Sequence, residues 1–382
     1  FLYDGTFTAH VGYVYNTGYG LDMINNSYNF IQVLQDTIWQ VDQSLIDDFA
    51  EKILLGLEPI LVNGVASDIM SGRNVGAGVY YGQSISNVIG KLGELSAEPY
   101  RSMFTALAKE CALQTGTENS FSADNTIVER GPVTNFKRFV MGDKVVYHND
   151  GWGLGLGMYS NRIRNFERVN NQAMKAWYSN SGALYLMNHD TSEYDNDWWT
   201  AVNHYHLPGT TVDMVERSTE KWEGEGYSPY SWVSSMDLDE KYGCAGYTNY
   251  NYFSSLTSLK SYFVFDDEVV CIGSDISGGT NHIETTVANQ RLRDDNSNEL
   301  YINGEKVTEQ QLTDVEADTI YLEGNAEGDS YGYYFPDGQT IQYVNSYRSA
   351  EATDFNVNFT PGIVEDYFTE IWIDHGLQPE NA

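Results

Sequence analysis

Basic side chains are scarce in this sequence. Its 382 residues include 21 Lys and Arg against 54 Asp and Glu, which gives a formal net charge of −33 at pH 7. This charge argues against nucleic acid and against an anionic membrane surface as partners. To bind an acidic polymer, the chain must gather its few cations in one place, because its overall field repels a polyanion.

Cysteines and long apolar segments are also scarce. Cys111, Cys244 and Cys271 are odd in number, lie far apart and lack the spacing of metal ligands, so neither a disulfide framework nor a cysteine metal site is expected. No stretch is apolar enough over enough residues to cross a bilayer. The chain opens at Phe1 without an initiator methionine or a leader, which says nothing about its location.

Two kinds of hydrophobic pattern divide the chain. Apolar residues recur every three or four positions at 21–37, 44–62, 82–97 and 101–115, which predicts helices. Short β-branched and aromatic runs follow at 145–147, 183–187, 262–265, 269–272, 319–322, 341–344 and 368–373, which predicts strands. Helices first and many strands afterwards indicate an α+β chain with a helical domain at 1–118 and an antiparallel β domain at 119–382.

Glycine alternates with bulky residues at 151–157. A strand of this kind lets another backbone or a sugar approach closely. It lacks the spacing of a dinucleotide-binding fingerprint and opens no helix, so we exclude that function.

The first nineteen residues carry the strongest chemical signal. His10 and Tyr19 stand nine positions apart on a turn rich in glycine and aromatic residues, and together they supply two of the groups needed to remove a proton from carbon. Arg73 follows in a short loop between predicted helices, where it can stabilise a tyrosinate. The alternative is structural, because tyrosine and histidine also pack in cores and exposed arginine is usually only solvated.

Further segments follow in a fixed order, namely Ser71-Gly72-Arg73, Ser160-Asn161-Arg162, Asn165 to Asn170, Trp177-Tyr178 and Leu207 to Thr211. Together with the first nineteen residues they resemble the hyaluronate, chondroitin AC and xanthan lyases of polysaccharide lyase family 8. The resemblance implies part of an α/α toroid followed by a large antiparallel β-sandwich (supersandwich), with the active cleft where the two meet. It also implies β-elimination on a uronic-acid polysaccharide to leave a 4,5-unsaturated uronate end.

The resemblance assigns roles to particular residues. Tyr19 would act as base and then acid, His10 as a second base or as a donor to the substrate carboxylate, and Arg73 as the stabiliser of negative charge. Glu167 and Asn170 would come from the β domain and orient the arginine and the histidine. The alternative for Glu167 is a plain surface ion pair with Arg162 or Arg164.

Substrate contacts are expected from Asn170, from Arg162 and from four aromatic residues. Trp177, Tyr178, Trp198 and Trp199 could stack on sugar rings, although core packing competes equally for each of them.

Metal sites are weakly indicated. The acidic run Asp190, Glu193, Asp195 and Asp197 has calcium-like ligands but not the spacing of an EF-hand, so a solvated loop is favoured over a structural calcium site. His204 and His206 have no visible third ligand, which argues against zinc. No cofactor is expected.

Three departures from the family pattern matter. The family's catalytic asparagine and aromatic patch lie tens of residues before the histidine, whereas only nine residues precede His10 here. Family members also continue beyond the position of Ala382, so this chain is expected to be the central portion of a longer protein. A second arginine that family members often carry is Ala77 here, which puts the identity of the polymer in doubt.

The expected function is therefore cleavage of a hyaluronan- or chondroitin-type polymer by a secreted bacterial enzyme. Xanthan side-chain cleavage is the second choice, and a non-catalytic carbohydrate-binding or scaffold protein is the alternative from another functional class.

Overall fold

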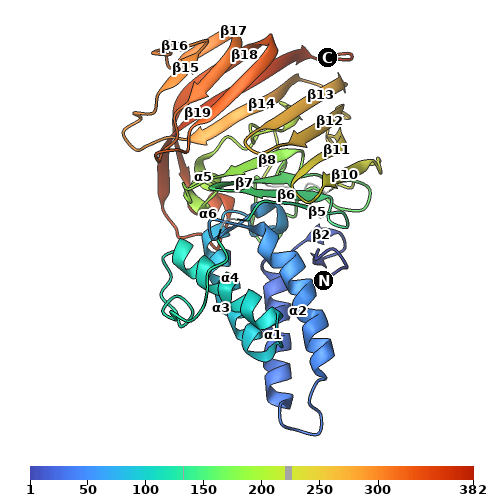
Figure 1. The fold of residues 1–382 in the computed structure, drawn as a ribbon. Coiled ribbons are helices and arrows are strands. Elements are labelled where there is room, and N and C mark those ends of the chain that lie inside the picture. The colour runs from blue at the N-terminus through green and yellow to red at the C-terminus, as the bar shows by residue number, and fades with distance from the viewer. Residues whose placement is uncertain (132, 220–225) are drawn as a thin grey trace.

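A computed structural model describes residues 1–131, 133–219 and 226–382. The helical part comes first and the sheets follow, as Figure 1 shows. The chain's amino end lies beside the junction of the two parts, and its carboxyl end lies at the far side of the sheets. The expected α+β order is confirmed.

Four amphipathic helices form the first part, and each buries the apolar stripe predicted from its sequence. They are α1 (Tyr19–Leu34), α2 (Gln43–Leu57), α3 (Gly78–Leu95) and α4 (Tyr100–Gln114). The prediction for the second helix was wrong at its end. Instead of reaching residue 62, α2 stops at Leu57 and the chain tightens into a 3₁₀ turn, η1 (Glu58–Ile60), because Pro59 has no N–H for an interior helical bond.

Short elements lie before α1 and between α2 and α3. They are the hairpin β1 (Thr8–Ala9) and β2 (Tyr13–Val14), the hairpin β3 (Leu61–Val62) and β4 (Val65–Ala66), and the 3₁₀ turn η2 (Asp68–Met70). Among the described residues, no helix is both long and apolar enough to traverse a lipid bilayer.

The described residues of the second part form three antiparallel sheets. The sheet nearest the helices has the order β5 (Asn135–Phe139), β6 (Lys144–Asn149), β7 (Trp152–Gly157) and β8 (Ala183–Met187). The second has the order β10 (Val233–Leu238), β11 (Tyr242–Tyr250), β12 (Thr257–Val264) and β13 (Val269–Ser277).

The third sheet is the largest. Its order is β16 (Glu305–Lys306), β15 (Leu300–Ile302), β17 (Gln311–Leu322), β18 (Tyr331–Glu351), β19 (Ile363–Leu377), β14 (His282–Arg291) and β9 (Thr211–Asp213). Two short helices, α5 (Asn196–Ala201) and α6 (Ala352–Phe355), pack against each other and against β18.

The alternating glycines of β7 bring the two parts into close contact. A Cβ on Gly153 would lie 2.5 Å from Val62, and one on Gly155 would lie 2.4 Å from the Ser67 hydroxyl. The stretch therefore admits a neighbouring protein segment, the first of its two predicted uses. This contact places η2, and the loop after it, against the sheet.

One hydrophobic core crosses this junction. It joins Ile60, Ile69 and Met70 of the helical part to Val146 and Tyr185 of the sheet. Because both parts bury side chains in the same cluster, residues from both can be held in a fixed relative position.

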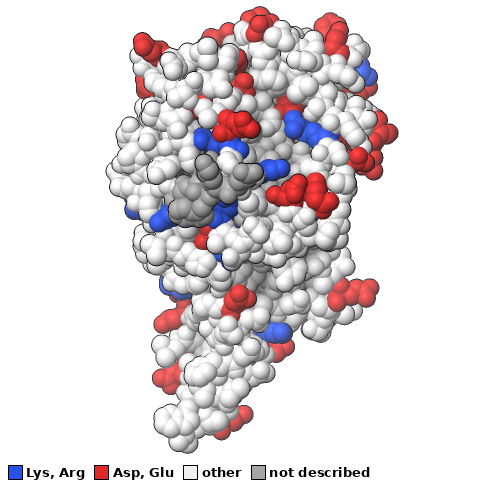
Figure 2. All heavy atoms as spheres, turned by 180° about the vertical axis from the view of Figure 1, so that it is seen from behind, with Lys and Arg blue, Asp and Glu red and all other residues white. Residues whose placement is uncertain are grey.

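Charges are unevenly distributed on one face of the molecule. On the face in Figure 2, several Lys and Arg side chains lie in the middle of the sheet-containing part, with clusters of acidic side chains directly beside them. The cations visible on this face are therefore interspersed with carboxylates.

Candidate active site

Five side chains from both parts of the chain meet at the junction. His10 lies in the loop between β1 and β2, Tyr15 follows β2, and Tyr19 opens α1. Arg73 lies in the loop between η2 and α3, and Glu167 comes from the long loop between β7 and β8. We call these five residues the junction cluster.

Glu167 is the centre of the junction cluster. Its carboxylate lies 2.5 Å from His10 Nδ1, accepts a hydrogen bond of 2.7 Å from Arg73 Nη1 and accepts another from the Tyr15 hydroxyl. Burial alone would raise the pKa of Glu167, but the hydrogen bonds from Tyr15, His10 and Arg73 outweigh burial and lower it. The carboxylate is therefore ionised and accepts the hydrogen bond. His10 Nδ1 carries the proton and donates it to the carboxylate.

Arg73 connects Glu167 to Tyr19. Its Nη2 donates to the Tyr19 hydroxyl oxygen at 2.7 Å, and its Nε donates to Gln172 Oε1 at 2.6 Å. Burial alone would lower the pKa of Arg73, but the hydrogen bonds with Tyr19 and Glu167 raise it, so the group stays charged. A fixed cation thus points at the Tyr19 oxygen.

The two tyrosines of the cluster differ in their surroundings. Tyr15 is fully buried, and burial followed by the Glu167 hydrogen bond raises its pKa, so it stays a neutral donor. It also accepts a 3.0 Å hydrogen bond from the Arg73 backbone N–H. Tyr19 is only partly buried, and its ring centroid lies 4.9 Å from that of His10. Only Tyr19 is therefore placed to exchange a proton with a bound molecule.

Gly72 makes the Arg73 contacts sterically feasible. Its φ is +58°, and a Cβ there would lie 2.0 Å from the Tyr15 ring. The Ser-Gly-Arg segment therefore needs glycine at this position so that the Arg73 backbone can reach the Tyr15 hydroxyl.

Asp68 holds the far end of the arginine loop. Both of its carboxylate oxygens lie 3.1 Å from the Gly76 backbone nitrogen, and Trp199 Nε1 donates to Oδ2 at 2.7 Å. Burial raises the pKa of Asp68 to about 7 despite these hydrogen bonds. The loop from 71 to 77 is thus fixed at both ends.

The other expected site residues lie around the cluster. Asn170 is exposed, with φ +57°, in a turn closed by the hydrogen bond from Gln172 N to Val169 O. Arg162 pairs with Asp143 at 2.5 Å and is not part of the cluster. The alternative in which Glu167 pairs with Arg162 or Arg164 was wrong, because Glu167 pairs with Arg73 and His10.

The four proposed sugar platforms require correction. Trp177, Tyr178, Trp198 and Trp199 are at most 4% exposed, and all belong to the core that crosses the junction. A sugar cannot stack on a ring face that is already covered, so these residues are core residues.

The acidic run also differs from expectation. Glu193 is buried, and Asp195 caps α5 through Trp198 N and pairs with Arg291. Only Asp197 of the four is exposed, so the run is not a solvated loop. Across 1–131, 133–219 and 226–382, no group of three or more His, Cys, Asp or Glu is arranged to hold a metal ion.

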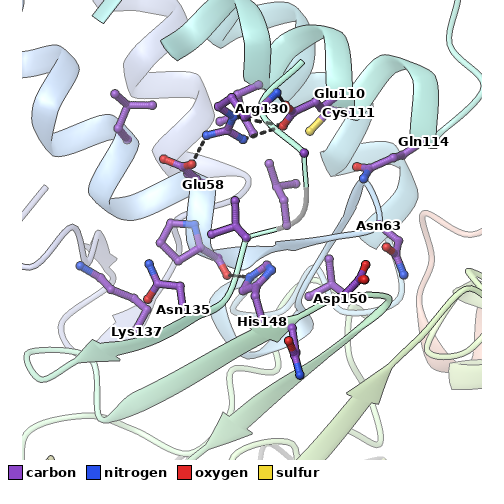
Figure 3. A pocket seen from close by; sticks show the side chains of 18 of the residues that line it. Glu58, Asn63, Glu110, Cys111, Gln114, Arg130, Asn135, Lys137, His148 and Asp150 are labelled. Atoms are coloured by element: carbon purple, nitrogen blue, oxygen red, sulfur yellow. Dashed lines mark hydrogen bonds and ion pairs between the residues drawn. The ribbon is translucent and has the colours of Figure 1, made fainter. Parts of the chain in front are cut away.

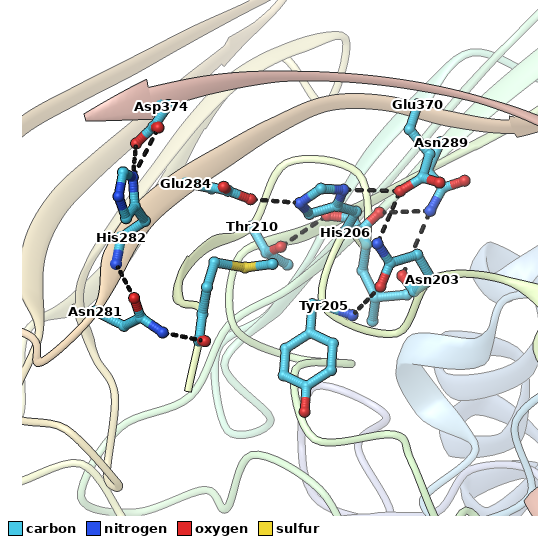
Figure 4. A network of polar contacts seen from close by, with 12 residues as sticks. Asn203, Tyr205, His206, Thr210, Asn281, His282, Glu284, Asn289, Glu370 and Asp374 are labelled. Carbon is cyan, nitrogen blue, oxygen red and sulfur yellow. Dashed lines mark hydrogen bonds and ion pairs between the residues drawn. The ribbon is translucent and has the colours of Figure 1, made fainter. Parts of the chain in front are cut away.

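A second buried polar network surrounds His206. Its two ring nitrogens bond Glu284 at 2.6 Å and Glu370 at 2.8 Å, as Figure 4 shows. His204 instead bonds the Trp199 carbonyl at 2.8 Å. The two histidines therefore point to different partners.

A cavity of about 670 Å³ lies between the helices and the first sheet. Figure 3 shows part of its lining, where Arg130 bridges Glu58 and Glu110 and His148 bonds the Pro59 carbonyl. None of the junction cluster lines it.

Asn16 is the one amide in the first eighteen residues that could be considered for the substrate carboxylate. Its Nδ2 donates to Gly5 O at 2.7 Å and to Gly56 O at 2.8 Å, and its Oδ1 accepts from Phe7 N at 2.8 Å. The side chain is fully buried and is occupied in holding the amino-terminal segment.

Two residues of the site were not anticipated from the sequence. Tyr15 stands four positions before Tyr19, and Gln172 two positions after Asn170. A tyrosine among 29, or one glutamine in a loop, gives no chemical signal until the fold brings Arg73 beside it.

Comparison with known proteins identifies the family to which this chain is similar. Residues 134–382 match the super-sandwich domain of polysaccharide lyase family 8, and residues 1–100 match the N-terminal alpha-helical domain of the same family. A xanthan lyase from Bacillus sp. (strain GL1) is 32% identical over 415 residues, covering 100% of this chain and 43% of that protein. A hyaluronate lyase from Enterococcus faecalis is 25% identical, covering 100% of this chain and 41% of that protein.

The solved structures agree. The structure of a Paenibacillus xanthan lyase has a TM-score of 0.93 at 29% identity, covering 100% of this chain and 39% of that one. The chain thus spans about two fifths of the length of these relatives. Since matches to two domains of one family account for most of the sequence, and the helix-then-sandwich fold agrees with them, the chain belongs to polysaccharide lyase family 8.

Proposed function

We propose that the protein containing this chain cleaves a uronic-acid-containing polysaccharide by β-elimination. The observation that carries the proposal is Tyr19, a partly buried residue that lies beside His10 and whose hydroxyl is bonded at 2.7 Å to a guanidinium. Family membership supports the same chemistry, since the named relatives are xanthan and hyaluronate lyases.

The reaction requires one proton to move from carbon to oxygen. As a phenolate, Tyr19 takes the proton from C5, beside the uronate carboxylate. The C5–H electron pair forms the C4–C5 double bond, and the C4–O bond breaks toward the leaving glycosidic oxygen. The Tyr19 hydroxyl then gives its proton to that oxygen. Arg73 Nη2 stabilises the negative charge that Tyr19 carries at the start of this step.

His10 is the proposed acceptor of the proton that Tyr19 first releases. Because Nδ1–H is donated to Glu167, the neutral ring keeps its lone pair on Nε2. Within the part of the chain that the structure describes, Nε2 has no hydrogen-bond partner, and the His10 side chain is 43% exposed. In the charged ring the same nitrogen can donate to the substrate carboxylate.

Hyaluronan or chondroitin is the first substrate class that we propose. Xanthan is the second candidate, and the observation that favours it is the higher identity to a xanthan lyase, 32% against 25% for a hyaluronate lyase. All three polymers are therefore needed in the assay.

The test is Tyr19→Phe in the natural full-length protein. We expect turnover to fall by about 10²–10⁴-fold with polymer binding retained, because only the ionisable oxygen is lost. The readout is the rise in ultraviolet absorbance from a double bond conjugated with the carboxylate, measured on hyaluronan, chondroitin and xanthan.

Tyr230→Phe serves as the matched control. This residue is exposed, and its ring contacts Tyr250 rather than the junction cluster. Retention of more than half the wild-type kcat in Tyr19→Phe would refute the role of Tyr19. Polymer binding without any absorbance change in the wild type would support the carbohydrate-binding alternative instead.

A further inference from the structure

The turn that carries His10 has an unusual backbone. His10, Val11 and Gly12 have φ values of +46°, +58° and +101° in succession. A β-branched residue such as valine is rarely found at positive φ, because its side chain crowds the backbone there. Val11 is also 80% exposed, so burial of its side chain does not offset this strain.

Contacts from the β part hold this turn. Arg164 N donates to Gly12 O at 2.9 Å, and Arg164 Nε donates to Val11 O at 3.2 Å. The Tyr227 hydroxyl also donates to Val11 O, at 2.9 Å. Three hydrogen bonds from distant segments thus converge on two consecutive carbonyls of a three-residue loop.

Stacking fixes the arginine that makes two of these bonds. The Arg164 guanidinium lies 4.4 Å from the centroid of the Tyr227 ring and 5.5 Å from that of Tyr13, distances typical of cation–π contacts. Gly12 allows the close approach, since a Cβ there would lie 2.8 Å from the Tyr227 hydroxyl.

We propose that Arg164 and Tyr227 are positioning residues that keep the His10 turn in its strained, left-handed conformation and so present the imidazole to Tyr19. The proposal rests on the proposed function, in which His10 exchanges a proton with Tyr19. The carboxylate of Glu167 holds the His10 ring, and the Arg164–Tyr227 pair holds the backbone of the next two residues, Val11 and Gly12. Strain of this kind is held at functional sites by the surrounding structure.

The position of Val11 provides a direct test. Glycine adopts positive φ without steric cost, so Val11→Gly removes the part of the strain that comes from the valine side chain. If the pair acts by holding the turn, loss of the Tyr227 hydroxyl should matter less when residue 11 is glycine.

The experiment compares kcat and KM in the full-length protein for wild type, Tyr227→Phe, Val11→Gly and the double variant. We expect Tyr227→Phe to lower kcat about tenfold while KM changes less than about twofold, because a small misplacement of a reacting group slows the chemical step more than binding. In the Val11→Gly background, adding Tyr227→Phe should lower kcat by much less than the tenfold expected in the wild-type background. Tyr230→Phe, which removes a hydroxyl three residues further along, should leave kcat unchanged.

Two results would overturn the proposal. One is a Tyr227→Phe protein with lower thermal stability but wild-type kcat, which would make the contact purely structural. The other is an equal loss of kcat in both backgrounds, that is, the same fold-change when Tyr227→Phe is added to Val11→Gly as when it is added to the wild type. Failure of the proposed function is seen separately, as a wild-type protein without lyase activity or an active Tyr19→Phe protein.

Discussion

Glu167 and Glu370 are two buried glutamates with similar partners and different surroundings. Each bonds the Nδ1 of a histidine, His10 or His206, and each pairs with an arginine, Arg73 or Arg348. The first glutamate lies in the junction cluster, and the second lies on β19 in the network of Figure 4.

The difference between them lies in the remaining ring nitrogen. His206 Nε2 is occupied by Glu284, its side chain is 5% exposed, and its ring lies 4.8 Å from that of Trp372. His10 is 43% exposed, and its Nε2 has no hydrogen-bond partner in the described ranges. The same residue types therefore make a closed structural network in one place and leave an available nitrogen beside a tyrosine in the other.

Among the variants that test this difference, Glu167→Gln should have the largest effect on kcat. The amide cannot accept from Tyr15, His10 and Arg73 as the carboxylate does, so the guanidinium and the imidazole lose their common anchor. We expect kcat to fall about 10²-fold, the loss typical when reacting groups move by about 1 Å. The measurement is kcat at saturating polymer, normalised to the folded fraction. A kcat close to that of the wild type would show that Glu167 is as structural as Glu370.

Glu370→Gln is the matched variant in the closed network. Removing one partner of a buried ion pair costs about 3–5 kcal/mol, because the other charge remains buried. We expect the free energy of unfolding to fall by up to this amount, while kcat per folded molecule stays close to that of the wild type. Urea unfolding and the lyase assay measure the two quantities. A large loss of kcat in fully folded protein would mean that the network reaches the active site.

Sequence patterns predicted the helices and the strands because burial of one face imposes a regular spacing of apolar residues. This spacing can be recognised without knowing which segments pack against that face. The 183–187 run is β8 as expected. The predicted extension of the second helix was wrong, because Pro59 lacks the backbone donor that a continuing helix needs. Patterning could not separate Trp199 as a sugar platform from Trp199 as a core residue, since both uses favour the same ring. Only the fold shows that Asp68 accepts its indole N–H.

The junction cluster was predictable only in part for a related reason. His10, Tyr19, Arg73 and Glu167 were named from their resemblance to a family. Tyr15, Gln172, Arg164 and Tyr227 act through contacts between segments far apart in sequence. These contacts span between 58 and 216 positions and leave no local pattern, so the residues emerge only when the two parts pack together.

The smallest expected effect is a pH window in the stability of the closed network. Burial alone would raise the pKa of Glu370, but bonding to His206 and the charge of Arg348 lower it from 4.5 to about 2. Its contribution is therefore complete above pH 4.5 and is lost as the pH falls toward 2.

His206 sets the upper side of this window. Burial alone would lower its pKa, but the hydrogen bonds to Glu284 and Glu370 raise it above 6.5. Its contribution is therefore complete below pH 6.5 and is lost as the pH rises through the raised value. The difference in unfolding free energy between wild type and Glu370→Gln should then be greatest between pH 4.5 and 6.5 and smaller on either side. Urea titrations of both proteins inside, below and above this range measure the difference. A difference that does not change with pH would mean that folding shifts the pKa of neither Glu370 nor His206, which would contradict the expected window.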